Sequence, residues 1–325
     1  MENKILLQIG SVSVTGYSVC VCVAAMMFSL LVLLRAKKHQ IKQETAEWFT
    51  LFSLLLGIFC GHFLYCLSLI YQILPDPEEG IAAFFMPWKG NFMMFGVIGG
   101  CVVSAWLAGR ITGERMSRIL DFSALPICIF IACVRFASPL CGQGYGSEVS
   151  EEFLHFFPLS YVLDPEYEDE LYFAVFIYEG LAALAIGLII SLLKQKPAGF
   201  KAAYALIFYS ASQIFFESIR EDQLVEWLFV RVSQIYATLI MLGILIFCLV
   251  KAGQKEAYVR NLVLYLVLVA ACVFFEFIKD KPAVLGMYIE LDNVYCHSAM
   301  FVLAACMGVV SSRSLRRLGQ DGIIF

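Results

Sequence analysis

The residue best placed to do chemistry is an arginine inside an apolar segment. Arg135 stands near the end of the run ICIFIACVRFASPLCG, and Pro139 and several glycines follow it. A charge at membrane depth is costly to hold, so such a residue marks a functional site by default. A guanidinium grips phosphate through two parallel hydrogen bonds, which predicts an anion site at Arg135. The alternative is an arginine whose head reaches the outer membrane interface without a ligand.

A second polar group lies along the run 202–219. Glu217 and Arg220 share one helical face at the spacing i, i+3. Tyr209 and Gln213 precede them by two turns and one turn on that face. Together they predict a polar stripe that faces protein or a water-filled cavity rather than lipid. Taken alone, the Glu217 and Arg220 pair is more typical of an interfacial ion pair than of a ligand site.

Glycines and isolated polar residues mark other helix contacts. The glycines around the start of the run 92–109 are Gly90, Gly96, Gly99 and Gly100. They indicate close helix packing, with a backbone opened for a ligand as the less common alternative. Lone polar residues inside other runs predict hydrogen bonds between helices, and these residues are His62, Glu276 and His297.

Several kinds of site have no sequence signature in this chain. The sequence has no nucleophile elbow, zinc signature or phosphate-binding glycine loop, so we expect neither a bound metal nor a cofactor. The 12 cysteines lie mostly in apolar runs without a CxxC pair, which favours small hydrophobic packing over redox chemistry. A basic stripe is also missing, so a nucleic-acid partner is not expected.

The elements that must position these residues are transmembrane helices. Of the 325 residues, 61% are hydrophobic and only 15% are charged, whereas a soluble domain is about a quarter charged. About 20 apolar residues cross the hydrocarbon core as a helix. We therefore predict an all-α, polytopic bundle in the membrane bilayer with about nine spans. The runs are 12–34, 49–74, 92–109, 119–140, 171–193, 202–219, 229–250, 261–278 and 294–312. The sixth is the shortest and most polar.

The distribution of Lys and Arg predicts the orientation of the bundle. Sixteen of these residues lie in alternate connections, and six lie in the opposite set. Because positive charge is retained on the cytoplasmic side, the N-terminus is expected outside and the C-terminus in the cytoplasm.

The chain resembles the bacterial prolipoprotein diacylglyceryl transferases over about residues 5–250. The strongest segment is DFSALPICIFIACVRFASPLCGQGYG, in which Asp121 and Arg135 keep the family's spacing of fourteen residues. Gly142, Tyr145 and Gly146 keep the end of that signature. Other similar segments are QIGSVSVTGYSV, GIFCGHFLYCL, KGNFMMFGVIGG, FIYEGL, YSASQIFFESIRED and RVSQIYATLIMLG.

This resemblance implies a set of site residues. The expected catalytic residues are Arg135, Tyr17, Tyr209 and Glu217. The expected substrate-binding residues are Arg135, Ser138, Gln143, Gly146, Gln213 and Arg220. Four positions depart from the family pattern. Phe95 replaces its histidine, Ser138 an asparagine, Gln143 a glutamate and Gln213 its second arginine.

The resemblance implies transfer of diacylglyceryl from phosphatidylglycerol, or a similar anionic phospholipid, to the lipobox cysteine of a preprolipoprotein signal peptide. It places the chain in the bacterial plasma membrane and divides it into a seven-helix domain, 1–250, and two further helices within 251–325. Because the departures fall on the base and on one phosphate-binding arginine, catalytic competence is an open question. The alternative is a non-catalytic membrane protein that binds lipid or lipoprotein. A transporter is disfavoured because no inverted repeat is visible.

Overall fold

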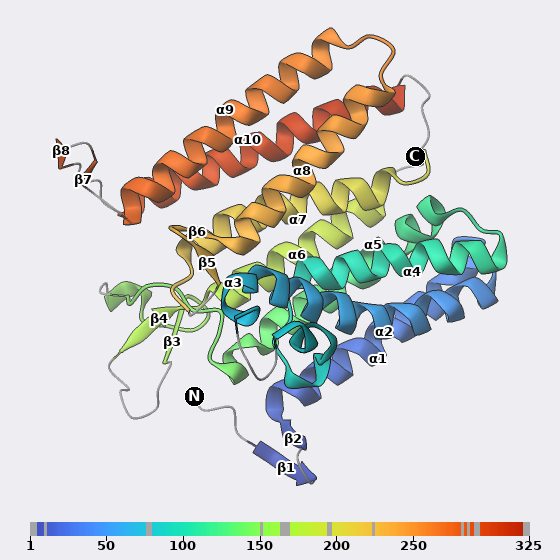
Figure 1. The fold of residues 1–325 in the computed structure, drawn as a ribbon, viewed down its shortest axis with the longest axis horizontal. Coiled ribbons are helices and arrows are strands. Elements are labelled where there is room, and N and C mark those ends of the chain that lie inside the picture. The colour runs from blue at the N-terminus through green and yellow to red at the C-terminus, as the bar shows by residue number, and fades with distance from the viewer. Residues whose placement is uncertain are drawn as a thin grey trace.

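Long helices running side by side make up most of the protein (Figure 1). The structure is a computed structural model, and it describes residues 5–9, 12–75, 80–149, 152–162, 170–193, 197–222, 225–280, 283–284, 287–288 and 293–320. Within these residues the long helices are α1 (Gly16–Lys38), α2 (Gln43–Ser68), α4 (Met94–Thr112), α5 (Met116–Ala137), α6 (Val175–Leu192), α7 (Phe200–Ile219), α8 (Val232–Lys251), α9 (Glu256–Asp280) and α10 (Asn293–Gln320).

Short elements gather at one end of the long helices, at the left of Figure 1. They include the hairpins β3 (Ser160–Val162) with β4 (Leu171–Phe173), β5 (Glu226–Trp227) with β6 (Val230–Arg231), and β7 (Ala283–Val284) with β8 (Met287–Tyr288). The hairpin β1 (Ile5–Ile9) with β2 (Val12–Thr15) leads into α1. The remaining pieces are α3 (Ile70–Ile73), η1 (Gly80–Phe85), η2 (Pro87–Lys89), η3 (Ser138–Cys141) and η4 (Glu152–Leu154).

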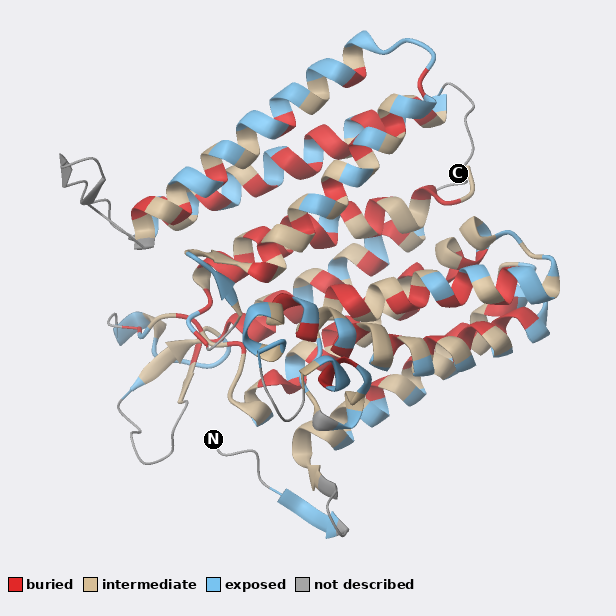
Figure 2. Ribbon diagram, in the orientation of Figure 1, coloured by how far each residue is buried: buried red, intermediate tan, exposed pale blue. Residues whose placement is uncertain are grey.

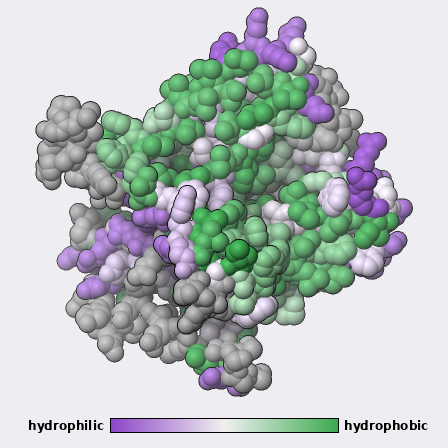
Figure 3. All heavy atoms as spheres, in the orientation of Figure 1, coloured by the Kyte–Doolittle hydropathy of each residue, from purple (hydrophilic) through white to green (hydrophobic). Residues whose placement is uncertain are grey.

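The long helices have the length and composition of membrane spans. Eight of them are apolar enough to cross a bilayer. Figure 3 shows hydrophobic atoms along the helices and hydrophilic atoms toward their ends. Large side chains that face outward from the helices include Leu34, Leu55, Leu188 and Val267. Since an aqueous surface would not favour this arrangement, the protein is an all-α, multi-pass membrane protein, as predicted.

The long helix that falls outside those eight is α7, the sixth predicted span. It packs against α5, α6, α8 and α10. Its buried residues include Tyr209, Gln213 and Glu217, and Figure 2 shows it rich in buried positions. Its polar stripe is therefore covered by protein, which explains how a helix of low hydropathy occupies the bundle.

Helix ends differ from the apolar runs by several residues. The second run was predicted over 49–74, whereas α2 spans Gln43–Ser68 and is followed by a break at Leu69. The ninth was predicted over 294–312, whereas α10 continues to Gln320. Hydrophobicity detects only the lipid-covered part of a helix, and polar turns extend beyond it.

The clustered glycines pack helices together, which confirms the packing interpretation for two of them. A Cβ atom on Gly96 would lie 2.4 Å from the carbonyl oxygen of Cys60 in α2. A Cβ on Gly100 would lie 2.5 Å from the carbonyl oxygen of Leu56. By contrast, nothing lies within 4 Å of the corresponding point on Gly99. Only glycine fits where the α2 and α4 backbones meet.

His62 differs from its predicted role as a link between helices. Its Nδ1 atom lies 2.9 Å from the carbonyl oxygen of Gly90, and its Nε2 atom lies 2.9 Å from that of Ala83. Both partners belong to the short 80–91 connection. The imidazole therefore fastens this connection to α2 through two of its backbone carbonyls.

Candidate functional site

The site is built on a shared register between α5 and α7. At one end of the pair, Asp121 accepts hydrogen bonds from the backbone N–H groups of Gly199 (2.8 Å) and Ala202 (2.9 Å). Fourteen residues later on each helix, Nη2 of Arg135 donates to Oε1 of Gln213 at 2.6 Å. Fourteen residues span about 21 Å of helix. The Asp121 of the signature is thus a cap for α7, far from Arg135.

A buried carboxylate on α6 joins two arginines. Oε2 of Glu179 lies 3.4 Å from Nη1 of Arg135, and its Oε1 lies 3.7 Å from Nη1 of Arg220. Gln213 donates to the same carboxylate at 3.4 Å. The Glu179 side chain is fully buried, so its charge depends on these neighbours. Gln213 therefore bridges Arg135 and Glu179, in the place where the family pattern has a second arginine.

Arg220 is held by acids on both sides. Its Nε donates to Oδ1 of Asp222 at 3.0 Å, and its Nη2 also pairs with that carboxylate. Its Nη1 lies 3.4 Å from Oε1 of Glu217, the i, i+3 ion pair that the spacing predicted. Arg231 lies 3.6 Å from Asp222 and donates to the Arg220 carbonyl. Three arginines and three buried acids thus form one charge-balanced set, which we call the arginine network: Arg135, Arg220, Arg231, Glu179, Glu217 and Asp222.

The segment after α5 clamps the end of α7. Gly146 forms a β-bridge with Arg220, and the Tyr145 carbonyl accepts from the N–H of Glu221 at 3.0 Å. A Cβ on Gly146 would lie 2.9 Å from the Ile219 carbonyl oxygen, so this position requires glycine. Gly144 donates its N–H to Asp222 at 2.8 Å. This part of the signature therefore fixes Arg220 and Asp222 through backbone contacts.

Two other predicted residues lie on the same segment but face the backbone. Ser138 is buried and its hydroxyl donates to the Val134 carbonyl at 3.2 Å. The N–H of Gln143 donates to the Ser138 carbonyl at 3.1 Å. The two residues thus shape the turn beside the arginine network, and a direct contact of either with a ligand stays a prediction.

Aromatic residues lie beside the arginine network. Tyr209 is buried, and its ring centroid lies 5.6 Å from that of Phe95, the residue in place of the family's histidine. Tyr17, in the first turn of α1, lies within electrostatic range of Arg135 and Arg220. At the Phe95 position the site therefore offers an apolar ring and no proton acceptor.

Several buried polar atoms of this site have no hydrogen-bond partner. They are Nε of Arg135, Oε2 of Glu179, the hydroxyl of Tyr209, Oε2 of Glu217 and Nη1 of Arg231. Buried polar groups are nearly always satisfied, so a cluster of such atoms requires an explanation. The set combines donors with acceptors. A ligand that carries both an anionic oxygen and hydroxyl groups would match it.

Two phenols flank the Asp222 side of the network, beyond the helices. Burial, followed by the charge of Asp222, raises the pKa of Tyr161 and of Tyr145 above the ordinary value for tyrosine. Tyr161 packs edge-on against Phe176 with ring centroids 5.1 Å apart. Both phenols stay neutral at physiological pH, so they add hydrogen-bonding capacity and no charge.

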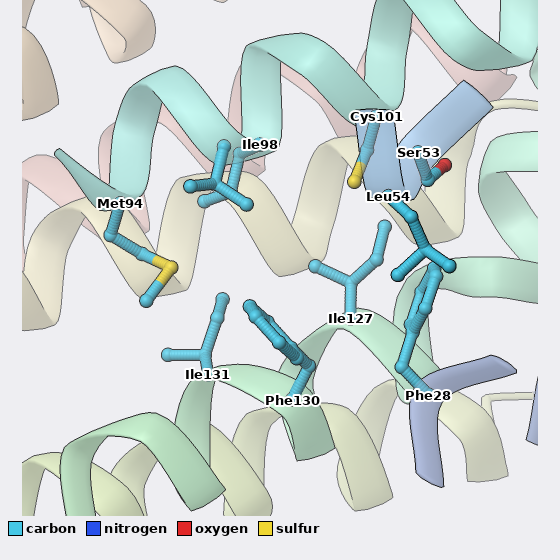
Figure 4. Close-up of a pocket in the computed structure, with 10 residues that line it drawn as sticks. Phe28, Ser53, Leu54, Met94, Ile98, Cys101, Ile127, Phe130 and Ile131 are labelled. Atoms are coloured by element: carbon cyan, nitrogen blue, oxygen red, sulfur yellow. The ribbon is translucent and has the colours of Figure 1, made fainter. Parts of the chain in front are cut away.

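Apolar cavities lie elsewhere in the bundle. One of about 40 Å³ lies between α1, α2, α4 and α5, where Met94, Ile98, Ile127 and Phe130 converge on it (Figure 4). Its lining has no charged residue. Such a space suits hydrocarbon and has no group for acid–base chemistry, so the arginine network is the better candidate for function.

The structure brings together most of the residues expected from the sequence. Arg135 does not snorkel to the interface; it points to α6 and α7, and its side chain is 13% exposed. The sequence-based site omitted three residues that the structure joins to it, namely Glu179, Asp222 and Arg231. Glu179 carried a usable signal, a carboxylate inside an apolar run. Asp222 and Arg231 carried no such signal. Asp222 follows one predicted span and Arg231 stands at the start of the next, where charged residues are common.

Comparison with known proteins gives one consistent result. The sequence profile of the prolipoprotein diacylglyceryl transferase family matches residues 4–250. A phosphatidylglycerol–prolipoprotein diacylglyceryl transferase of Bacillus velezensis is 25% identical over 250 residues, covering 75% of this chain and 90% of that protein. Enzymes of the same name are 27% identical in Listeria monocytogenes (77% and 91% covered) and 25% identical in Streptococcus pyogenes (78% and 97% covered).

Proposed function

We propose, from the premise that this chain belongs to the prolipoprotein diacylglyceryl transferase family, that it transfers diacylglyceryl from phosphatidylglycerol to a lipobox cysteine. We place it in the bacterial plasma membrane and assign it a turnover far below that of its relatives. Its partners in this proposal are an anionic phospholipid and a preprolipoprotein signal peptide.

The unpartnered atoms of the arginine network carry this proposal. A phosphatidylglycerol headgroup has a phosphate that accepts hydrogen bonds and glycerol hydroxyls that donate them. Nε of Arg135 suits the phosphate, and Oε2 of Glu217, which has no partner, suits a hydroxyl. Since the acids balance the arginines already, the site favours a ligand with both chemistries over a bare anion.

The proposed reaction forms one bond and breaks one. The cysteine thiolate attacks the glycerol carbon that bears the phosphodiester, a carbon–sulfur bond forms, and glycerol-1-phosphate leaves with the electron pair of the carbon–oxygen bond. Arg135 stabilises the charge on the departing phosphate. Tyr17, Tyr209 and Glu217 line the site, and Ser138, Gln143, Gly146, Gln213 and Arg220 shape its walls. The thiol ionises near its ordinary pKa because Phe95 is no base.

A second function is favoured by a specific observation. Gln213 accepts from Arg135 and donates to Glu179, whereas an arginine at this position could only donate. A neutral, closed network beside an apolar Phe95 suits a protein that holds lipid or lipoprotein without converting it. The added helices beyond residue 250 would then belong to a specialised binding protein.

The deciding experiment is complementation combined with product analysis. Expressed alone, the protein should not support growth of a bacterium depleted of its own diacylglyceryl transferase, because a base and a phosphate clamp each contribute about 100-fold or more. Mass spectrometry should nevertheless detect the diacylglyceryl thioether on a lipobox peptide, and Phe95→His with Gln213→Arg should increase it. Absence of the thioether from both proteins would favour the binding function. Full rescue by the natural sequence would contradict the low turnover.

Lipid binding can be tested apart from turnover. Arg135→Ala should weaken binding of phosphatidylglycerol in nanodiscs more than Arg220→Ala, provided that both variants stay folded, because Arg220 is committed to Asp222. Arg135→Lys should also bind less well, since a point charge replaces a planar fork. Equal affinity of the natural protein and Arg135→Ala would remove Arg135 from the site.

The proposed orientation puts the arginine network at the outer face. This end carries the β3–β4 and β5–β6 hairpins, and the lysine-rich connections lie at the other end. A reporter fused after the last residue should be active in the cytoplasm. Activity restricted to the outside would reverse the orientation.

A further inference from the structure

The two helices beyond the family match are packed against the site helices. The match ends at residue 250, and α9 and α10 follow. In the structure α10 contacts α7 and α8, and α9 contacts α8 and α10 (Figure 1). Helices α9 and α10, which we call the hairpin, therefore cover α7 on the side opposite α5. Their contacts with the end of α7 lie next to residues of the arginine network.

One of these contacts is made by a lysine at the end of α9. Nζ of Lys279 donates to the backbone carbonyl of Ser218 at 2.5 Å. Ser218 lies in the last turn of α7, where carbonyls have no partner within the helix. His297 of α10 lies against the same Ser218 backbone. This carbonyl stands between Glu217 and Arg220 in the chain, so its position affects both side chains.

A second contact passes through Gln234 of α8. Its Nε2 donates to the Ile214 carbonyl at 3.1 Å and to Oε1 of Glu276 at 2.6 Å. Its Oε1 accepts from the N–H of Arg231 at 3.3 Å. Glu276 thus fixes the amide that touches both α7 and Arg231, the residue just before α8. This bond also confirms the predicted hydrogen bond between helices at Glu276.

The hydrogen bond from Gln234 to Glu276 lies beside a gap in the apolar packing of these helices. A cavity of about 180 Å³ lies between α7, α8, α9 and α10, lined by Ile214, Gln234, Thr238, Cys272 and Glu276 among others. Where a void separates helices, dispersion contacts are lost and the helices are held less firmly. Gln234 and Glu276 line this cavity, so their hydrogen bond joins α8 and α9 where apolar contact is missing.

We propose that Glu276 and Lys279 are positioning residues. By holding the last turn of α7 and the start of α8, they set the places of Glu217, Arg220 and Arg231 in the arginine network. The hairpin is thereby part of the ligand site of this chain, although it lies outside the family match. The functional consequence rests on the proposed binding of phosphatidylglycerol.

The test compares five variants of the full chain, two at Glu276, two at Lys279 and one control. Glu276→Leu removes the acceptor for Gln234, whereas Glu276→Gln keeps an acceptor oxygen. Asn261→Leu is the matched control, because it breaks the α9–α10 bond from Asn261 to Ser314 (2.8 Å) at the other end of the hairpin. Binding of phosphatidylglycerol in nanodiscs is measured together with hydrogen exchange of the backbone over residues 209–220.

We expect Glu276→Leu to weaken lipid binding about five- to tenfold and to speed exchange over 209–220, since the buried Gln234 amide loses one of its two acceptors. Glu276→Gln and Asn261→Leu should leave both close to the natural protein. Lys279→Met should act like Glu276→Leu, and Lys279→Arg should restore binding.

Three outcomes separate the hypotheses. Unchanged exchange over 209–220 in Glu276→Leu overturns the positioning role. Equal losses in Glu276→Leu and Asn261→Leu also overturn it, because general destabilisation then explains both. If the natural protein binds no phosphatidylglycerol and Glu276→Leu alone speeds exchange, the positioning of α7 stands and the proposed function fails.

Discussion

Helix α5 contacts both ends of α7, but the polar groups at the two ends differ in how fully they are hydrogen-bonded. At the Phe200 end, Asp121 of α5 satisfies the backbone N–H groups of the first turn. At the Glu217 end, Arg135 of α5 and its partners satisfy one another only in part, and buried polar atoms remain unpaired. A helix cap completes a fold, whereas a partly paired network is complete only with another molecule. This contrast makes the Glu217 end the better candidate for ligand binding.

The largest loss in the free energy of unfolding should come from breaking the arginine network. Arg220→Met leaves Asp222 and Glu217 without their buried cation, so unfolding in detergent should become easier by about 3–5 kcal/mol. The matched control is Arg118→Met, which breaks the exposed pair with Glu114 (2.8 Å) and should cost at most about 1 kcal/mol. Similar losses in both variants would show that the network is no more stabilising than a surface pair.

A smaller loss in the free energy of unfolding should come from removing Asp121, the cap at the Phe200 end of α7. Asp121→Ala leaves the N–H groups of Gly199 and Ala202 without acceptors, and the expected loss is about 0.5–2 kcal/mol. Asp121→Asn keeps an acceptor oxygen and should lose less. Thermal unfolding measures both. Lipid binding should survive in each variant, and a loss of binding in Asp121→Asn would contradict the separation of the two ends.

An effect similar in size to that of Asp121→Ala should come from the ligand itself. Phosphatidylglycerol at ten times its dissociation constant stabilises the bound state by about 1.4 kcal/mol. Hydrogen exchange should slow over residues 209–220 and stay unchanged over 200–205. Uniform slowing along α7 would mean that the lipid stabilises the whole bundle rather than the Glu217 end of α7. Phosphatidylcholine, which has no glycerol hydroxyls on its headgroup, is the control lipid.

The sequence predicted much of the fold because lipid imposes a simple rule. A run of apolar residues near 20 in length is a helix, and eight helices satisfy that rule. The rule is weakest at α7, where burial by protein replaces burial by lipid. Helix ends were displaced at α2 and α10 because polar turns continue a helix without changing the hydrophobic signal.

The site was harder to predict because its contacts join distant residues. Arg135 and Gln213 are 78 positions apart, and so are Asp121 and Gly199. That repeated interval reflects the shared register of α5 and α7, which no spacing within one helix reveals. Asp222 and Arg231 were invisible for another reason. Outside the apolar runs a charge is expected in water, yet Asp222 is buried. The separate status of residues 251–325 as a domain stays a prediction.

The enclosed position of α7 also constrains how the protein is made. On insertion scales a charged residue at the centre of a helix costs about 2.5–3.5 kcal/mol, and polar residues such as Gln213 add to the burden that Glu217 already brings. A segment of this kind partitions poorly into lipid by itself. Because α5 and α6 are synthesised before α7, Arg135 and Glu179 are already present in the membrane when α7 leaves the ribosome. We therefore expect assembly of the Glu217 end of α7 to depend on the order of synthesis, with α7 entering the bilayer together with α5 and α6.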